Sequence, residues 1–305
     1  MKNVILLSAI LMLVTFIEAG TWTVLDAPGA DRTHIMDIEG SNIVGFYEAD
    51  DGWHGFLHNL ESNEWTILDA PGVGVDTGQA TQVNGIQGEN LVGYYSTNTG
   101  IPNGFIYNTT TQDWTILNDP EATNTRPFAI DNSNILGWGQ FSNELRTSGI
   151  IFDGDNWTKL SFPDSQESYL YDIDGNIAVG KVQTGPLTCR GTIFDMETNN
   201  WNVLDAPGAT QTEIHGVDGN NLVGIYYDGS EGHGFLFNGL EWTSLDAPGE
   251  TSTYIGTYVK GIDGDNIVGY YYDSDSNPHG FIYTIPEPAT LLLFGLGGLI
   301  LRKRK

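Results

Sequence analysis

The sequence predicts an all-β fold, a six-bladed β-propeller built from four-stranded antiparallel blades. Three observations lead to this prediction. Three sequence markers recur six times in the same order. Each recurring unit contains four runs of strand length joined by turn-forming residues. One such run is left over at the start of the predicted exported region, and one is missing at its end.

The recurring unit is 41 to 49 residues long, measured between successive tryptophans. Its other markers are a glycine inside the second run and a glycine near the start of the third run. The markers are Trp22, Trp65, Trp114, Trp157, Trp201 and Trp242, then Gly45, Gly93, Gly137, Gly180, Gly224 and Gly269, then Gly55, Gly104, Gly149, Gly191, Gly234 and Gly280. A repeat of this length with four strands is typical of one propeller blade.

The four runs of the first unit are residues 33–38, 42–47, 54–59 and 64–68. Asp-Gly and similar pairs between the first two runs favour the positive φ of tight hairpin turns. Consecutive strands joined by short turns form an antiparallel meander. We expect the glycine inside each second strand to let neighbouring sheets approach closely.

The segment 21–25, Thr-Trp-Thr-Val-Leu, is the leftover fourth run. The sixth unit begins near Thr257 and reaches Pro286 without such a run. If the N-terminal strand completes the last blade, the ring is closed and no sheet edge of an open array is exposed. The sequence therefore predicts one propeller over residues 21–285, closed by strand 21–25. The alternative is an open β array or a paired sandwich.

Both ends of the chain have the features of targeting segments. Residues 1–20 contain Lys2 and an apolar stretch from Val4 to Ile17, the pattern of a secretory signal peptide. An uncleaved membrane anchor is the alternative. Residues 286–305 combine a Pro-Glu-Pro triplet, an apolar run predicted to be a transmembrane segment, and a basic end. The residues of this motif are Pro286, Glu287, Pro288, Arg302, Lys303, Arg304 and Lys305.

This C-terminal order resembles the PEP-CTERM sorting signal of exopolysaccharide-producing Gram-negative bacteria. The resemblance implies export through the inner membrane by the secretion machinery and a transient membrane-anchored state. It also implies removal of the tail by an exosortase-like membrane protease, and delivery to the cell surface or extracellular matrix. The tail is then an address rather than part of the fold.

The chain is strongly acidic, with a formal charge of −27. The two ends carry five of the 12 Lys and Arg residues and two of the 39 Asp and Glu residues, so residues 21–285 have a charge of −30. Such a surface repels nucleic acid and attracts cations or a cationic partner. A solvated acidic surface that maintains solubility is the simpler interpretation. The single cysteine, Cys189, excludes an intramolecular disulfide.

Binding is expected at the face with the loops between second and third strands, because these loops vary most among the units. Trp53 and Trp138 lie on or near this face, where they would stack on sugar rings or pack between blades. Arg146 and Arg190 lie in or beside these loops, in the two units that hold most of the basic residues. We expect this sector to contact an acidic polysaccharide or a protein partner. Relief of self-repulsion is the alternative.

The sequence His-Gly-Phe begins three of the third strands, at His54, His233 and His279. It resembles the HAF-type extracellular repeats of bacteria, which implies a propeller-like extracellular protein without an established activity. Hydrogen bonding to a neighbouring loop is the preferred role of these histidines, because blades 1, 5 and 6 place them too far apart for one metal site. The repeated Asp-Ala-Pro-Gly segments are predicted turns.

Calcium is the one cofactor considered, and only weakly. Asp273, Asp275 and Asn277 have the alternating oxygen ligands of a calcium loop, without its central glycine or closing glutamate. No other metal or cofactor is predicted. The sequence contains no phosphate loop, no Gly-x-Ser-x-Gly and no His-Glu-x-x-His. No catalytic residue is singled out.

The predicted function is that of a non-catalytic propeller at the cell surface or in the matrix, binding a polysaccharide or a protein in an exopolysaccharide or biofilm context. The alternative is a hydrolase or lyase that acts on a polysaccharide at the loop face. Unlike polar residues that differ between blades and converge on the central channel would discriminate between the two. Repetition in every blade indicates structure, and a break in repetition indicates function.

Overall fold

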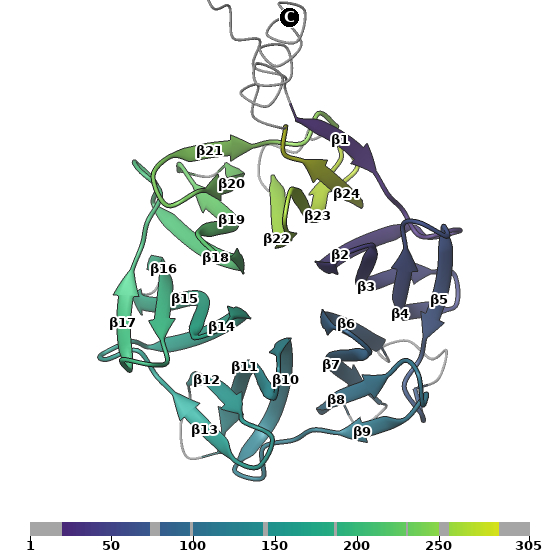
Figure 1. Cartoon of the computed structure of the whole chain (residues 1–305), viewed down its shortest axis with the longest axis horizontal. Coiled ribbons are helices and arrows are strands. Elements are labelled where there is room, and N and C mark those ends of the chain that lie inside the picture. Colours follow the sequence, from purple (N-terminus) through teal and green to yellow (C-terminus); the bar gives the residue numbers. More distant parts are fainter. Residues whose placement is uncertain are drawn as a thin grey trace, which may run out of the picture.

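The computed structural model describes residues 20–73, 80–97, 100–142, 146–185, 188–229, 231–249 and 256–286. All regular elements in these ranges are β-strands, arranged as sheets around a central axis (Figure 1). The predicted all-β propeller arrangement is therefore confirmed. No helix in the described ranges is long and apolar enough to cross a membrane. Residues 1–19 of the predicted signal peptide, and the sorting residues from Glu287 onward, lie outside the described residues.

Four of the sheets have four strands each. The first contains β10 (Ala122–Asp131), β11 (Asn134–Phe141), β12 (Thr147–Phe152) and β13 (Trp157–Leu160). The second contains β14 (Glu167–Asp174), β15 (Ile177–Gly185), β16 (Thr188–Asp195) and β17 (Asn200–Val203). The third contains β18 (Gln211–Asp218), β19 (Asn221–Tyr227), β20 (Gly232–Phe237) and β21 (Trp242–Leu245). The fourth contains β22 (Thr257–Asp263), β23 (Asn266–Tyr272), β24 (Pro278–Thr284) and β1 (Thr21–Val24).

The remaining sheet has eight strands and consists of two successive meanders. One meander is β2 (Arg32–Glu39), β3 (Asn42–Ala49), β4 (Gly52–Asn59) and β5 (Glu64–Leu68). The other is β6 (Ala80–Gln87), β7 (Asn90–Ser96), β8 (Pro102–Asn108) and β9 (Trp114–Ile116). Neighbouring strands within each meander are antiparallel. A single parallel pair, Trp53 with Ala80, joins the two meanders.

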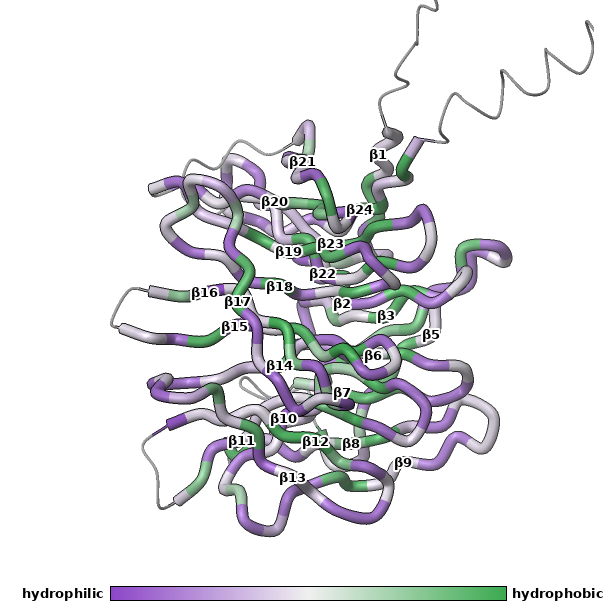
Figure 2. Tube along the Cα trace, turned by 60° about the vertical axis from the view of Figure 1, so that its left-hand side comes forward, coloured by the Kyte–Doolittle hydropathy of each residue, from purple (hydrophilic) through white to green (hydrophobic). Residues whose placement is uncertain are grey.

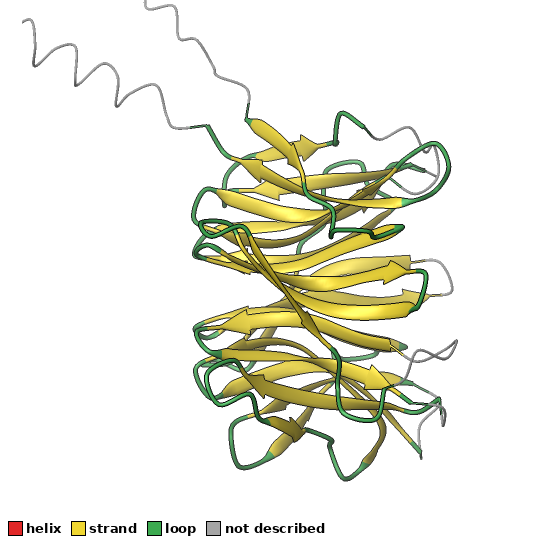
Figure 3. Ribbon diagram, turned by 90° about the vertical axis from the view of Figure 1, so that its right-hand side faces the viewer, coloured by secondary structure: helices red, strands yellow, loops and turns green. Residues whose placement is uncertain are grey.

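The N-terminal strand β1 pairs with β24, the last strand in the described part of the chain, as the split sixth unit predicted. Thr21 lies opposite Thr284 and Val24 opposite Phe281 in an antiparallel register. The Leu25 amide continues the pairing by donating to the Gly280 carbonyl oxygen at 2.8 Å. The start of β1 and the end of β24 therefore lie side by side at one edge of the molecule (Figure 3).

A circuit of hydrogen bonds links the turns that follow the first strand of each unit. In each link, the side chain that ends one first strand accepts a hydrogen bond from a backbone amide in the corresponding turn of the next unit. The links are Glu39 to Gly88, Gln87 to Asn132, Asp131 to Gly175, Asp174 to Gly219, Asp218 to Gly264 and Asp263 to Gly40. The last of these links joins the sixth unit to the first in the same way as the other five links join successive units.

The glycine that recurs in each second strand is required by its own sheet. A Cβ at Gly137 would lie 2.9 Å from the carbonyl carbon of Arg126, on the paired first strand, and closer still to the carbonyl oxygen. The expectation that these glycines serve an approach between sheets was therefore wrong. Approach between sheets does occur at the third-strand glycines, since a Cβ at Gly55 would lie 2.8 Å from a Val83 methyl group of the next meander.

The cores lie between the faces of adjacent sheets, where hydrophobic strand segments alternate with polar loops (Figure 2). Phe56, Phe105, Phe235 and Phe281 are almost completely buried there. Each of the six recurring tryptophans is half-buried and packs on the phenylalanine of the preceding strand, with ring centroids 4.6 to 5.0 Å apart. Their structural role is therefore confirmed, although none is fully buried.

Candidate functional site in the central channel

The first strand of each unit is the innermost strand and lines the central axis (Figure 1). Each of these six strands contains a β-bulge. A bulge inserts one residue into a strand and changes the direction of its side chain. The inserted residues are Met36, Asn84, Phe128, Tyr171, His215 and Lys260.

The six bulge residues surround one cavity of about 20 Å³ on the axis. This volume accommodates about one water molecule. The six residue types are all different, although the residue before the bulge is apolar in every unit. The channel is thus the place where the repetition of the chain breaks.

Asn84 gives this cavity an unsatisfied polar atom. Its side chain is only 4% exposed. Its amide nitrogen donates to the Pro127 carbonyl oxygen at 2.9 Å, while its Oδ1 has no partner. Because an unpaired buried acceptor costs free energy, this site favours a ligand or water that donates a hydrogen bond.

A second layer of side chains lies two residues before the bulges, nearer the start of each first strand. It consists of His34, Gln82, Arg126, Tyr169, Glu213 and Tyr258. Residues of the second strands lie opposite them in register: Phe46, Tyr94, Trp138, Lys181, Ile225 and Tyr270. We call these twelve residues the channel belt. Since first strands run from the loop face toward the turns, the belt lies on the loop side of the cavity.

Arg126 is held between two aromatic rings of the belt. Its guanidinium carbon lies 4.6 Å from the ring centroids of both Tyr94 and Trp138. Its Nε is buried without a hydrogen-bond partner. It forms no ion pair with any carboxylate among the described residues. The faces of the guanidinium are thus occupied by aromatic rings, while its edge keeps unused donors.

Lys181, Glu213 and His215 form a charged cluster in the next sector. Lys181 Nζ lies 2.9 Å from Glu213 Oε1, and His215 Nε2 lies 3.2 Å from Glu213 Oε2. Burial opposes ionisation of Glu213, but its hydrogen bond to His215 and the charge of Lys181 outweigh burial and lower the pKa of the carboxyl group. Burial lowers the pKa of His215 to about 4. Glu213 is therefore ionised, and both of its oxygens are engaged.

Lys260 has no carboxylate within ion-pair distance among the described residues. Its Nζ lies 5.5 Å from the ring centroid of Tyr258 and 5.7 Å from that of Tyr270. The side chain is surrounded by protein but touches channel solvent, and burial lowers the pKa of its ammonium group to about 8. Burial, with the charge of Lys260 second, lowers the pKa of His34 to about 3, so this ring is neutral.

The other end of the channel is acidic. A depression of about 150 Å³ is lined by the residues of the turn circuit and by Asp37 and Asp172. Asp37 accepts hydrogen bonds from the Ile38 and Ile86 amides at 2.8 and 2.9 Å. Burial raises the pKa of Asp37 to about 7 and also raises that of Asp172. The channel therefore has a basic, aromatic belt on its loop side and carboxylates at its turn end.

The residues predicted to bind a partner are divided between the channel and the rim. Trp138 is half-buried in the belt on Arg126. Trp53 is half-buried, with its ring centroid 5.7 Å from those of His34 and Phe46. Arg146 is exposed, donates to the Ser165 carbonyl oxygen at 3.2 Å and lines a rim depression of about 440 Å³.

Arg190 occupies a structural pair that recurs in each unit between the third strand and the following turn. Its guanidinium lies 2.6 Å from the Asp205 carboxylate. Three other units have a histidine and an aspartate at these two positions. The equivalent pairs are His54–Asp69, Asn103–Asn118, Ser148–Ser161, His233–Asp246 and His279–Asp26. The predicted hydrogen bonding of the histidines to a neighbouring loop is confirmed.

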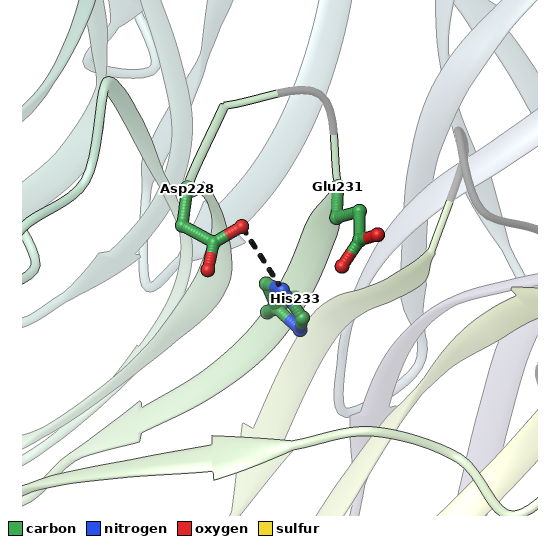
Figure 4. A group of neighbouring side chains, drawn as sticks. All are labelled: Asp228, Glu231 and His233. Carbon is green, nitrogen blue, oxygen red and sulfur yellow. Dashed lines mark ion pairs between the residues drawn. The ribbon is translucent and has the colours of Figure 1, made fainter.

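His233, Asp228 and Glu231 form the one group in the described ranges whose geometry would suit a metal ion (Figure 4). His233 Nε2 lies 3.4 Å from Asp228 Oδ1. Equivalent contacts, His54 with Asp51 and His279 with Asp273, recur in two other units. This repetition favours a structural role for the group.

The calcium candidate Asp273 caps its own turn. Its Oδ1 accepts hydrogen bonds from the Asp275 and Asn277 amides, both at 2.9 Å, and its Oδ2 contacts His279 at 3.2 Å. Calcium binding by Asp273, Asp275 and Asn277 stays a prediction.

Sequence reasoning missed Arg126, Lys181 and Lys260 as channel residues. It grouped Arg126 and Lys181 with the other basic residues of two adjacent units, and it left Lys260 outside that group. The signal was nevertheless present. Aligned on the second-strand glycine, the repeats place six different residues at the bulge position and five different residues at each of the two belt positions. The bulge interrupts the alternation of inward and outward residues, so the direction of these side chains was not readable.

Comparison with known proteins gives a sorting motif and a fold. Residues 284–305 match the PEP-CTERM protein-sorting motif, which implies an exported protein processed by an exosortase. No curated protein matches the chain. The likeness to HAF-type repeats stays a prediction.

Solved structures share the propeller fold at low sequence identity. The β-propeller domain of the trilobed protease from Pyrococcus furiosus, described as having an open velcro topology, has a TM-score of 0.55 and 10% identity over 85% of this chain and 97% of that domain. TolB from Acinetobacter baumannii has a TM-score of 0.53 and 10% identity over 86% of this chain and 65% of its own. A puromycin hydrolase mutant has a TM-score of 0.52 and 10% identity over 82% of this chain and 44% of its own.

Proposed function

We propose that the chain is an exported six-bladed propeller, closed by β1, that binds a saccharide or protein partner at the loop side of its channel without catalysis. The two meanders of the eight-stranded sheet count as separate blades, since only one residue pair joins them. The six-membered circuit of turn hydrogen bonds and the pairing of β1 with β24 support closure.

One observation supports binding in the channel: repetition holds in the turns, the cores and the His–Asp type pairs, but fails at the bulges and the belt. A position whose role is only to pack would tolerate the same residue in every blade. The six unlike bulge residues, with aromatic and cationic neighbours, instead provide the varied polar groups by which pockets fix a ligand's orientation.

The experiment for this proposal is a screen of the full chain, purified in detergent, against neutral and acidic glycans, with and without calcium. Binding to a glycan class that is weakened by Trp138→Ala supports the proposal, while a matched change at the rim, Trp201→Ala, controls for stability. The proposed binding function would be contradicted if no glycan retained the protein and no protein partner bound it. Loss of binding on calcium removal would support the predicted calcium loop at Asp273.

A polysaccharide lyase or hydrolase is the second candidate, and Lys260 favours it. A lysine with a pKa near 8 is suited to act as a base near neutral pH. We rank it lower, because both oxygens of the belt carboxylate Glu213 are already engaged by Lys181 and His215. Incubation with acidic polysaccharides separates the candidates: new ultraviolet-absorbing unsaturated ends indicate a lyase, new reducing ends alone a hydrolase, and unchanged chains a binding protein.

Export and surface sorting are proposed to follow from the matched C-terminal motif. The experiment replaces Pro286, Glu287 and Pro288 with alanine in the native host. We expect the intact chain to accumulate in the inner membrane, detected by immunoblot of fractionated cells. Release of a shortened protein at the normal rate would contradict exosortase processing.

A further inference from the structure

We propose that the channel belt binds a carboxylate-bearing sugar, with Arg126 holding the carboxylate and the Lys260 side chain adding positive charge from the opposite side of the channel. This inference deepens the proposed binding function and rests on it. It follows from the distribution of charge, from the state of Arg126, and from the unpartnered acceptors beside it.

Positive charge is concentrated in the channel of an otherwise acidic protein. Only seven basic side chains remain between residues 21 and 285, against 37 acidic ones. Three of the seven lie at the level of the belt and the bulges: Arg126 and Lys181 belong to the belt, and Lys260 lines the cavity on the axis. Glu213 neutralises one of them by its contact with Lys181. The loop side of the channel therefore keeps uncompensated positive charge, which favours the binding of an anion there.

Arg126 is organised for a planar anion. Tyr94 and Trp138 hold the two faces of its guanidinium, with both ring centroids 4.6 Å from the central carbon. Rotation of the side chain is therefore restricted before any ligand binds. Nη1 reaches only Tyr94 Oη, at the long distance of 3.5 Å, and Nε has no partner. Edge donors of this kind pair with a carboxylate through two parallel hydrogen bonds.

The rest of the site fits the hydroxyl groups of a sugar. Asn84 Oδ1 and His34 Nδ1 are buried and lack partners, and His34 is only 9% exposed. The depressed pKa of His34 keeps its ring neutral, so it retains a nitrogen that accepts a hydrogen bond. Hydroxyl groups would supply the donors that both acceptors lack, whereas a sulfate ion, which has no hydrogen to donate, would not.

Beyond the belt, the channel offers little room. The cavity at the bulge residues holds about 20 Å³, enough for one water molecule. A ligand entering from the loop side would therefore stop at this level, with Lys260 and Asn84 below it. This depth fits a single sugar or the end of a chain.

The experiment is calorimetric titration of the full chain, in detergent, with glucuronate, glucose, and inorganic sulfate. We expect glucuronate to bind and glucose to bind at least 10-fold more weakly. Arg126→Gln should weaken glucuronate binding by about 10- to 100-fold, the effect of losing a charge-assisted bidentate pair. Arg126→Lys, which keeps the charge but not the fork, should lose most of this affinity. Lys260→Met should abolish the decrease in affinity expected above about pH 8.

The matched control is Arg146→Gln, a rim arginine outside the belt, with melting temperatures recorded for every variant. Glucuronate binding that is lost in Arg146→Gln and kept in Arg126→Gln would overturn the channel site but would leave saccharide binding by the chain intact. Equal affinity for glucose and glucuronate, or for sulfate and glucuronate, would overturn the inference of a carboxylated sugar. Binding of a protein partner with no response to any sugar would overturn it as well. If Arg126→Gln does not fold, Arg126→Lys and Lys260→Met decide the outcome.

Discussion

Alanine in place of Gly137 should destabilise the protein strongly, whereas alanine at Gly139 should not. The two glycines are in the same strand, β11, two residues apart. A Cβ at Gly137 would lie 2.9 Å from both the Arg126 carbonyl carbon and the Pro127 Cα, and closer to the Arg126 oxygen. A Cβ at Gly139 would have its nearest neighbour, the Asn124 carbonyl oxygen, at 3.3 Å.

The expected magnitudes follow from these distances. At Gly137 the obstacle is backbone of the bulged strand β10, which cannot rotate away as a side chain would. We expect a loss of about 3 kcal/mol in unfolding free energy, at the upper end of the usual range for overpacking. At Gly139 a shift of a few tenths of an ångström suffices, and alanine restricts the unfolded chain, so the change should stay within about 1 kcal/mol.

The assay is urea unfolding followed by tryptophan fluorescence, provided that unfolding is reversible. Gly137→Ala should lower the midpoint markedly with an unchanged slope, because only the native state is strained. In thermal unfolding the same loss corresponds to roughly 6–12 °C. Equal midpoints for the two variants would refute the reasoning, since the close approach of β10 to β11 would then not exist.

Three further predictions concern the ring. Trp22→Ala should cost about 2 kcal/mol, less than the roughly 3–5 kcal/mol of a fully buried tryptophan, because Trp22 is half-buried on Phe281 and Tyr283; an unchanged urea midpoint would show that β1 is not docked. Asp263→Ala should cost about 1–2 kcal/mol by removing the bond to the Gly40 amide, and hydrogen exchange at Gly40 should accelerate, whereas unchanged exchange would contradict the circuit. Burial opposes protonation of His54, His233 and His279, but the neighbouring aspartates outweigh burial and raise the pKa of each histidine. The stability that these pairs contribute is therefore fully present below about pH 6.5, the pKa of an unfolded histidine. It is lost as the pH rises through the raised pKa values. Replacing all three with glutamine should flatten melting temperature against pH in this window, and an unaltered profile would contradict the pairs' role.

The blade pattern could be predicted from the sequence because the same local contacts recur in each unit. Three features recur from unit to unit. They are a tight turn after the first strand, a second-strand glycine that faces a carbonyl group of the bulged first strand, and a tryptophan that packs on a phenylalanine. The leftover strand 21–25 was placed correctly for the same reason: its residues fit one vacant position in the repeat, beside β24.

The channel was not readable because its side chains are directed by the bulges. Lys260 follows Val259 and precedes Gly261, and nothing in that order shows that the register shifts there. Likewise, Arg126 and Lys181 belong to adjacent units, which suggested a charged outer sector. Some of their aromatic and carboxylate neighbours, Tyr94 and Glu213, come from the adjacent unit, 32 residues away in the sequence, so only the packing of neighbouring sheets brings them together.

The pairing of β1 with β24 imposes an order on biogenesis. In an N-to-C export process, residues 21–24 emerge before the rest of the fold, yet their partner strand ends at Thr284, the first residue of the matched sorting motif. Apart from the single pair of Trp53 with Ala80, the other strand pairs among the described residues join consecutive strands, whereas this pair spans nearly the whole chain, and contacts of large sequence separation form slowly. The first strand must therefore wait, unpaired, until the last one has been translocated. The pairing of β1 with β24 becomes possible only when the tail reaches the membrane, so a protease that recognises the tail would act on a chain whose first and last described strands have only just become able to pair.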